Sequence, residues 1–178
     1  MQAPPGTEKP RCYTPSMFAA ETLSGSKPDQ YAQLLAQARA LMHGERDRVA
    51  NAANLSALVY HGLPQLNWAG FYFFDGRELV VGPFQGLPAC VRIPLDKGVC
   101  GAAASTGKTQ RVADVHEFPG HIACDSASRS EVVVPLFLPG DGSLIGVLDL
   151  DSPEPDRFDA DDQRGIEAIA QAFVESLA

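Results

Sequence analysis

Two apolar runs dominate the sequence, EVVVPLFL at 131–138 and SLIGVLDLD at 143–151. Between these two apolar runs stands PGDG at 139–142, a combination of residues typical of tight turns. Two runs of strand length on either side of such a turn predict an antiparallel β-hairpin. This is the strongest hairpin signal in the chain, and the remaining segments are expected to pack around it.

A second hairpin is predicted upstream of the first. NWAGFYFF at 67–74 is rich in aromatic residues, ends at the turn pair DG, and is followed by ELVVGPF at 78–84. The segment between the two hairpins is predicted to hold a strand at Cys90–Ile93, a short glycine-rich helix at Gly98–Thr106 and a strand at Thr109–Ala113. Together these strands predict one mostly antiparallel sheet.

Three amphipathic helices are predicted from the spacing of apolar residues. The first runs from Asp29 to Leu41, with Asp29 as its N-cap, and the second covers 46–61 and stops at the GLP that follows. The third closes the chain at Asp159–Leu177. Because residues 1–28 contain five prolines, which interrupt regular structure, we expect a flexible arm over 1–28 and one domain over 29–178.

These elements predict an α+β domain of two or three layers. The simplest arrangement has a central antiparallel sheet, with the N-terminal and C-terminal helices packed on one of its faces. The long, loop-rich stretch 87–129 is then left for the other face, where it would form the walls of a ligand pocket.

Composition excludes several functional classes. The chain has 178 residues, of which 45% are apolar and 20% charged, as expected for one folded domain. The net charge is −8 and there is no basic cluster, so nucleic acid is not an expected partner. There is no run of eighteen apolar residues and no apolar segment near the N-terminus. We therefore expect no membrane span, no secretory signal and a cytoplasmic location.

Four cysteines are the first candidates for chemistry. Cys12 stands alone in the N-terminal arm, whereas Cys90, Cys100 and Cys124 occur in the loop-rich middle. A permanent disulfide framework is not expected in the cytosol, and a free cysteine often serves only as a small core residue. All three central cysteines, however, stand beside turn residues and outside long apolar strands, which favours redox or catalytic use.

Zinc binding is the competing interpretation for this region. His116 and His121 lie close to Cys124 in the sequence and are residue types that bind zinc. A structural zinc site usually takes two ligands from one knuckle, two to four residues apart, and the cysteines do not have that spacing. A surface role for the two histidines is therefore favoured over a metal site.

Carboxylates form a second constellation. Asp149 and Asp151 are two residues apart in a predicted strand, so both point to the face opposite Leu148 and Leu150. Glu131 begins the partner strand of the same hairpin, so the three carboxylates are expected to converge. Such a cluster suits a cationic ligand and raises the pKa of at least one member. The alternative is a solvated acidic edge of the sheet.

Aromatic residues mark the neighbouring strand. Trp68, Gly70 and Tyr72 alternate and therefore share one face of the sheet. A stripe of this kind usually belongs to the core. The glycine, however, is expected to leave a gap between the two rings that a small apolar group can enter.

Four segments carry a resemblance to a known family: NWAGFYF, ACVRIPLDKGVCGAA, RVADVHEFPGHIACDSASRSE and IGVLDLDSPEPDRFDADD. Together they resemble the free methionine-(R)-sulfoxide reductases, which are stand-alone GAF domains. The resemblance runs from about Tyr31 to the C-terminus. It implies a GAF fold, with a central antiparallel sheet between helices, and reduction of the R-sulfoxide of free methionine rather than of methionine in proteins.

The resemblance also implies roles for the cysteines. Cys124, in the GHIACD motif, corresponds to the nucleophile that attacks the sulfoxide sulfur and becomes a sulfenic acid. Cys90 corresponds to the resolving thiol that forms a disulfide with it, and Cys100 to an auxiliary or alternative partner. Thioredoxin regenerates the dithiol, and no cofactor is implied. Cys12 is not part of the family pattern and is expected to be non-catalytic.

The remaining site residues acquire roles from a free amino-acid substrate. Glu131 and Asp151 are expected to deliver a proton to the sulfoxide oxygen, and Asp149 to pair with the α-ammonium group. Trp68 and Tyr72 are expected to hold the S-methyl group. Backbone N–H groups of the cysteine loops would receive the α-carboxylate, and the resemblance suggests a homodimer. The alternatives are a GAF module that binds a small ligand without catalysis, and a redox-sensing or metal-binding interaction protein.

Overall fold

The computed structural model describes residues 20–120 and 126–178 of the chain. Within these ranges six strands form one antiparallel sheet with the order β3-β2-β1-β6-β5-β4. Their bounds are β1 Trp68–Phe74, β2 Leu79–Gly86, β3 Arg92–Ile93, β4 Gln110–Val112, β5 Ser130–Phe137 and β6 Leu144–Ser152. The hairpin that dominates the sequence forms β5 and β6, and β6 lies at the centre of the sheet between β1 and β5.

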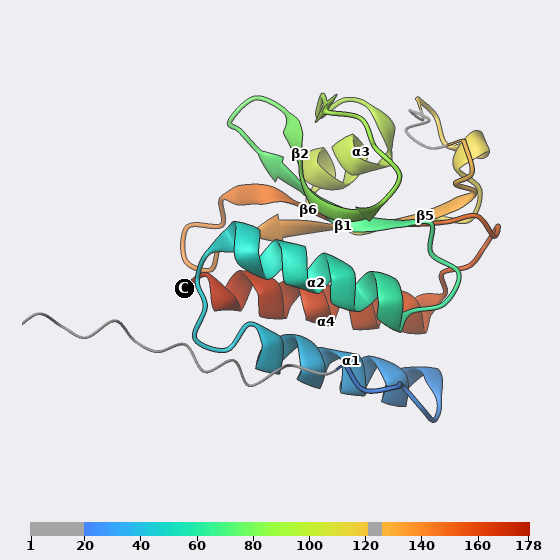
Figure 1. The fold of residues 1–178 in the computed structure, drawn as a ribbon. Helices are drawn as coiled ribbons and strands as arrows, with labels where there is room; N and C mark the ends of the chain where they lie inside the picture. Colours follow the sequence, from blue (N-terminus) through green and yellow to red (C-terminus); the bar gives the residue numbers. More distant parts are fainter. Residues whose placement is uncertain (1–19, 121–125) are drawn as a thin grey trace, which may run out of the picture.

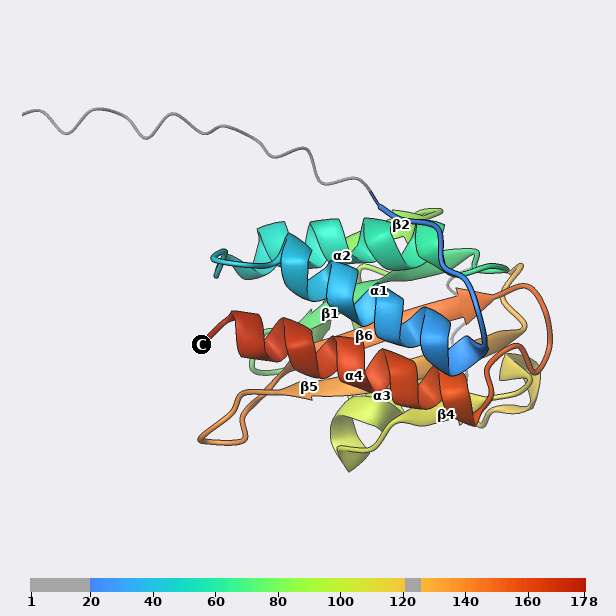
Figure 2. The same cartoon turned by 90° about the horizontal axis from the view of Figure 1, so that it is seen from below.

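The helices are divided between the two faces of the sheet. They are α1 Lys27–Leu41, α2 Arg48–Gly62, α3 Gly98–Thr106 and α4 Ala160–Ser176, with a 3-10 turn η1 at Val115–Glu117. Figure 1 shows α2 and α4 covering one face and α3 lying on the other. Helix α1 packs on the outer side of the α2–α4 pair, as Figure 2 shows from below. The predicted α+β class, with the N- and C-terminal helices on one face, is confirmed.

The start of α1 differs from the prediction. The helix begins at Lys27 and its N-cap is Ser26, whereas Asp29 occupies the third helical position. The Ser26 side chain accepts a hydrogen bond from the Asp29 N–H, and the Asp29 carboxylate accepts one from the Ser26 N–H. This reciprocal capping box explains why Asp29 is not itself the N-cap, and Pro28 is compatible with the first helical turn. The predicted division of the chain at residue 28 remains a prediction.

The main core lies between the sheet and the α2–α4 pair. Phe71 of β1 and Phe173 of α4 are fully buried, with ring centroids 4.5 Å apart. A buried carboxylate, Asp162, ties α4 to α1, because it accepts hydrogen bonds from the Tyr31 hydroxyl at 2.8 Å and from Lys27 Nζ at 2.7 Å. Polar groups on this side of the sheet are therefore buried together with their partners.

A second, smaller core lies on the opposite face. Alternate residues of the same strands, among them Tyr72 and Val133, pack there against Val99 and Ala103 of α3. Helix α3 has the predicted bounds, and Gly107 ends it in a left-handed conformation that suits glycine. The packing of α3 over β5 and β6 positions the candidate site.

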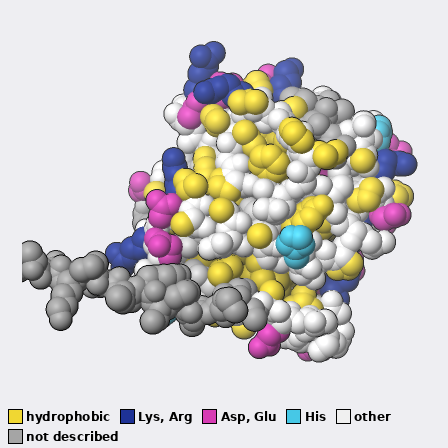
Figure 3. Space-filling view, viewed as in Figure 1, with side chains coloured by type: hydrophobic (Ala, Val, Ile, Leu, Met, Phe, Trp, Pro, Cys, Tyr) yellow, Lys and Arg dark blue, Asp and Glu magenta, His cyan; other side chains and the backbone are white. Residues whose placement is uncertain are grey.

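One face of the molecule has no dominant basic patch. On the face shown in Figure 3, basic side chains are scattered among acidic and apolar ones and do not gather into one patch. Among the described helices, none combines the length and the apolar character needed to cross a membrane.

Candidate active site

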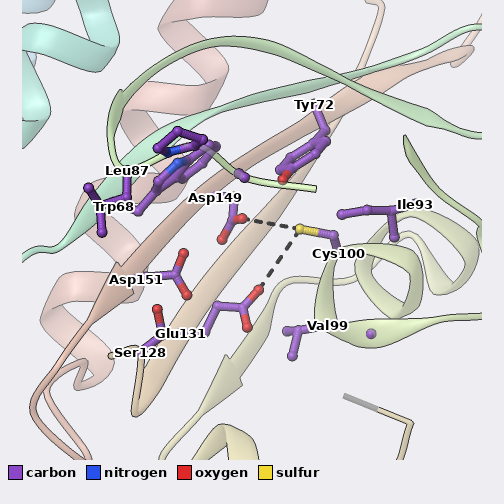
Figure 4. A pocket seen from close by; sticks show the side chains of 13 residues that line it. Trp68, Tyr72, Leu87, Ile93, Val99, Cys100, Ser128, Glu131, Asp149 and Asp151 are labelled. Atoms are coloured by element: carbon purple, nitrogen blue, oxygen red, sulfur yellow. Dashed lines mark hydrogen bonds between the residues drawn. The ribbon is translucent and has the colours of Figure 1, made fainter. Parts of the chain in front are cut away.

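A pocket opens on the α3 side of the sheet. Its floor is formed by β1, β5 and β6, one wall by the first turn of α3, and its rim by the loop Leu87–Ala89. The free volume is about 30 Å³, which is room for one or two water molecules. Figure 4 shows carboxylates, a thiol and aromatic rings that converge on this space.

The three predicted carboxylates meet in the pocket. Glu131 of β5 stands opposite Asp151 of β6 in the sheet register, and Asp149 lies two residues along β6 on the same face. Glu131 is 6% exposed and Asp149 is 5% exposed, whereas Asp151 is only partly buried. The predicted convergence is confirmed. The alternative of a solvated acidic edge is wrong for Glu131 and Asp149, because α3 and the rim loop cover them.

Cys100 contacts the same two carboxyl groups. It lies in the first turn of α3, and its Sγ is 3.3 Å from Asp149 Oδ2 and 3.9 Å from Glu131 Oε1. The spacing of Cys100 from Glu131 and Asp149 in the sequence gave no signal of this contact. The structure thus places Cys100 at the centre of the acidic cluster, and it is a free, buried thiol.

Burial controls the protonation of this cluster. Loss of solvent raises the pKa of the Glu131 carboxyl well above its usual range, and the neighbouring charges of Asp149 and Asp151 raise it further. Burial raises the pKa of Asp149 to about 7. It also raises the pKa of the Cys100 thiol, together with the charges of the nearby carboxylates. Both shifts favour the neutral forms, a carboxylic acid at Glu131 and a thiol at Cys100.

The aromatic wall is more closely packed than predicted. Trp68 stacks on Tyr72 with ring centroids 5.7 Å apart and on Phe84 of β2 at 5.1 Å. A Cβ atom added at Gly70 would come within 2.3 Å of Phe84 Cβ and 2.8 Å of Trp68 Cη2. The predicted gap over Gly70 is therefore wrong, because the Trp68 ring and Phe84 fill it. The glycine permits the stacking, and the rings of Trp68 and Tyr72 form a pocket wall.

Within the described part of the chain, two buried polar atoms in the pocket have no hydrogen-bond partner. These are Asp149 Oδ1 and Trp68 Nε1, which belong to residues that line the cavity. Buried polar side-chain atoms are nearly always hydrogen-bonded in native proteins. One acceptor and one donor are therefore available to a bound molecule.

The other predicted residues lie around or outside this site. Cys90 follows the rim loop and is part of a disulfide. Cys12, His121 and Cys124 lie outside the described residues. His116 is 58% exposed at its side chain and contacts Asp114 at 2.8 Å from Nδ1, which agrees with the predicted surface role.

The GAF domain family matches residues 50–177, which is most of the chain. The order and packing of the strands and helices, with the pocket on the α3 side, thus define a GAF domain. The predicted GAF fold is confirmed.

Three similar proteins indicate which family of GAF domains the chain belongs to. Free methionine-R-sulfoxide reductase of Escherichia coli is 48% identical over 153 residues, which cover 86% of this chain and 92% of the relative. A solved structure from Neisseria meningitidis, a free methionine-R-sulfoxide reductase in complex with its substrate, is 42% identical with a TM-score of 0.85 and covers 90% of this chain and 96% of its own. A structure from Burkholderia vietnamiensis, named as a GAF sensor protein, is 66% identical with a TM-score of 0.82 and covers 85% and 95%. The chain belongs to the free methionine-R-sulfoxide reductase family.

Proposed function

We propose that this protein reduces free methionine (R)-sulfoxide to methionine, with thioredoxin as the source of electrons. The observation that carries the proposal is the convergence of Glu131, Asp149 and Asp151 in a pocket with an aromatic wall. A buried cluster of carboxyl groups next to apolar rings complements a small amino acid that has an α-ammonium group and an S-methyl group. Membership of the family supports the same substrate.

Asp149 is the proposed partner of the substrate ammonium. Its Oδ1 atom is buried and without a hydrogen-bond partner, so a cationic donor is the group that would satisfy it. A nearby positive charge lowers the pKa of a carboxyl group, so the arriving ammonium would convert Asp149 into its charged form at neutral pH. The contact persists throughout the reaction and contributes mainly to binding.

Glu131 is the proposed proton donor to the sulfoxide oxygen. Its raised pKa favours the protonated form, which is the form a general acid requires. Asp151 faces Glu131 across the β5–β6 pair and has access to solvent. It is therefore suited to passing a proton from solvent to Glu131 after Glu131 has donated its own. Trp68 and Tyr72 would hold the S-methyl group against their rings.

The pocket also accounts for selection of a free amino acid. A cavity of about 30 Å³ is smaller than methionine sulfoxide, so the rim loop Leu87–Ala89 has to move before the substrate can bind. A site that closes over its ligand leaves no exit for a peptide chain. Peptide-bound methionine sulfoxide would therefore be a poor substrate.

The redox steps are proposed for the cysteines. The Cys124 thiolate attacks the sulfoxide sulfur, the oxygen is transferred to give a sulfenic acid, and methionine leaves. The Cys90 thiol then attacks the sulfenic acid, which forms a disulfide and releases water. Oxidised Cys90 agrees with this role, whereas the buried Cys100 thiol, with its raised pKa, is less suited to attack. Thioredoxin reduces the disulfide by thiol exchange.

A homodimer and a cytoplasmic location are part of the same proposal, and the homodimer rests on the family resemblance. Sedimentation of the reduced chain tests the first. Fractionation of cells that express the full chain tests the second.

The decisive experiment follows NADPH oxidation with thioredoxin, thioredoxin reductase and the free R-sulfoxide. The S-sulfoxide and an N-acetylated, C-amidated R-sulfoxide serve as matched substrate controls. Of these three substrates, we expect only the free R-sulfoxide to be turned over. If no turnover occurs and the free R-sulfoxide still binds, the protein is a ligand-binding GAF module and the proposal fails.

Cysteine variants test the assigned steps. We expect Cys124→Ser to abolish turnover and Cys12→Ser to retain it. Cys90→Ser should release about one methionine per site in a single turnover and then stop, since only the resolving step is lost. Steady-state turnover of Cys90→Ser at the wild-type rate would move the resolving role to Cys100.

A further inference from the structure

One thiol and two carboxyl groups in the pocket form a set of atoms suited to a metal ion. The atoms are Cys100 Sγ, a carboxylate oxygen of Glu131 and a carboxylate oxygen of Asp149, and all of them lie within 4.8 Å of one another. They come from three elements, α3, β5 and β6, and all three residues are at least nine-tenths buried. Figure 4 shows the three side chains pointing toward one another.

The distances match a tetrahedral site. Zinc binds thiolate sulfur at about 2.3 Å and carboxylate oxygen at about 2.0–2.2 Å, so the sulfur and an oxygen in one tetrahedron are about 3.5 Å apart. The measured separations from Cys100 Sγ are 3.3 Å to Asp149 Oδ2 and 3.9 Å to Glu131 Oε1. Small side-chain rotations would bring all three atoms to bonding distance from one ion.

Three further observations point to a small cation. Asp149 Oδ1 is buried without a partner, and among the described residues no Lys, Arg or His forms an ion pair with Glu131 or Asp149. The pocket, at about 30 Å³, holds a species the size of one or two waters. An ion fits the closed pocket, whereas an amino acid does not.

We propose that Cys100, Glu131 and Asp149 bind one thiophilic divalent cation of the zinc class, and that this cation blocks substrate binding. The set differs from the one considered in the sequence, which combined Cys124 with two histidines. Three protein ligands leave a fourth position for water. The ion takes the carboxylate that is proposed to hold the substrate ammonium, so the two compete.

Binding has to displace protons. The raised pKa values favour the protonated forms of Cys100 and Glu131, and each group has to release its proton to solvent when it binds the ion. A bound divalent charge also removes the repulsion among the acidic groups. The inhibitory part of the inference rests on the proposed reductase function, whereas the binding part does not.

The binding test uses Co²⁺ as a spectroscopic probe on the full chain, reduced with a phosphine so that no added thiol competes. We expect one Co²⁺ per chain, with a thiolate charge-transfer band and the intense visible bands of tetrahedral coordination. Zn²⁺ should displace it, and Mg²⁺, which prefers octahedral oxygen ligands, should not. Absence of the thiolate band overturns the proposal.

Matched variants identify the ligands. Cys100→Ser should weaken Co²⁺ binding by more than the roughly 10- to 100-fold that loss of an outer-shell partner costs, and Cys90→Ser should leave it unchanged. Glu131→Gln is a second ligand variant in case Cys100→Ser folds poorly, and Glu175→Gln on exposed α4 is its control. If Cys90→Ser loses the band and Cys100→Ser keeps it, the ion binds the reduced redox cysteines and the proposal fails.

The inhibition test measures turnover of the free R-sulfoxide with added Zn²⁺. We expect a rise in apparent KM with unchanged kcat, because ion and substrate compete for Asp149. A fall in kcat at constant KM would overturn the competitive mechanism. If the protein shows no reductase activity at all, the proposed function fails, but the Co²⁺ spectra still decide the metal site.

Discussion

The two faces of one sheet differ in how they bury polar groups. On the α2–α4 side, Phe71, Val132 and Leu150 are fully buried among apolar side chains. On the α3 side, their neighbours in the same strands include Glu131 and Asp149. Because successive strand residues point to opposite faces, one of two adjacent residues packs in the core and the other lines the pocket. A two-residue period is therefore enough to give one strand both a core face and a pocket face.

The two faces also differ in whether their buried polar atoms have hydrogen-bond partners. On the helix side, buried Asp162 accepts hydrogen bonds from Tyr31, Lys27 and Arg157. On the pocket side, Asp149 Oδ1 and Trp68 Nε1 are buried without partners. A buried polar atom without a partner costs about 1–3 kcal/mol. The pocket face therefore keeps binding capacity at the expense of stability. Substitutions on the pocket face should lower activity, whereas substitutions on the helix side should lower stability.

The largest expected effect is on the pocket side. Glu131→Gln should lower kcat by about a hundred- to ten-thousand-fold, because it removes the proton donor to the sulfoxide oxygen. Its thermal stability should not fall, since a buried carboxyl with a raised pKa is replaced by a neutral amide. Saturation kinetics and a melting curve measure both. The exposed Glu175→Gln is the control, and a wild-type kcat in Glu131→Gln would remove Glu131 from the mechanism.

The corresponding change on the helix side should affect stability alone. Phe173→Ala should destabilise the fold by about 3–5 kcal/mol, because it leaves a cavity beside Phe71. Its kcat at temperatures where it remains folded should equal that of the wild type. Denaturant unfolding tests this, with the partly exposed Phe137→Ala as the matched control. A stable Phe173→Ala, or one with a selectively lowered kcat, would break the division between the faces.

A smaller effect is expected at the proposed ammonium site. Asp149→Asn should raise KM by about thirty- to a thousand-fold, equivalent to about 2–4 kcal/mol, because a buried ammonium loses its charged partner. Its kcat should change less than that of Glu131→Gln, since the contact is made equally in ground and transition states. Initial rates over a wide substrate range separate the two constants. Asp151→Asn is expected to lower kcat, as Glu131→Gln does. The same rise in KM in all three variants would show that the three carboxyl groups do not have separate roles.

The smallest effect is on the pH dependence of stability. Folding raises the pKa of Asp149 from 3.8 to about 7, so the folded state favours the neutral acid. Its contribution to stability is complete below about pH 4 and is lost as the pH rises through about 7. We expect the wild type to lose more stability than Asp149→Asn between pH 4 and 8. Parallel curves for the two proteins would contradict the buried titration, and the exposed Asp96→Asn is the control.

Prediction from sequence succeeded where the signal is local. Helix α3 at Gly98–Thr106 and the β5–β6 hairpin follow from turn residues and apolar runs a few positions apart. It failed where a second residue competed for the same role, since Ser26 rather than Asp29 caps α1. It failed again at Gly70, where the space next to the glycine is filled by Phe84 of another strand.

Which side chains share a face follows from the amino-acid pattern, because the strand period places Asp149 and Asp151 together and opposite Leu150. The tertiary structure sets the burial, with Asp149 buried and Asp151 open to solvent. It also decided that Cys100, 49 residues away, lies against Asp149. The physical reason is that burial and long-range contact depend on how α3 docks over the sheet, and this docking is set by the summed packing of many side chains rather than by any local pattern.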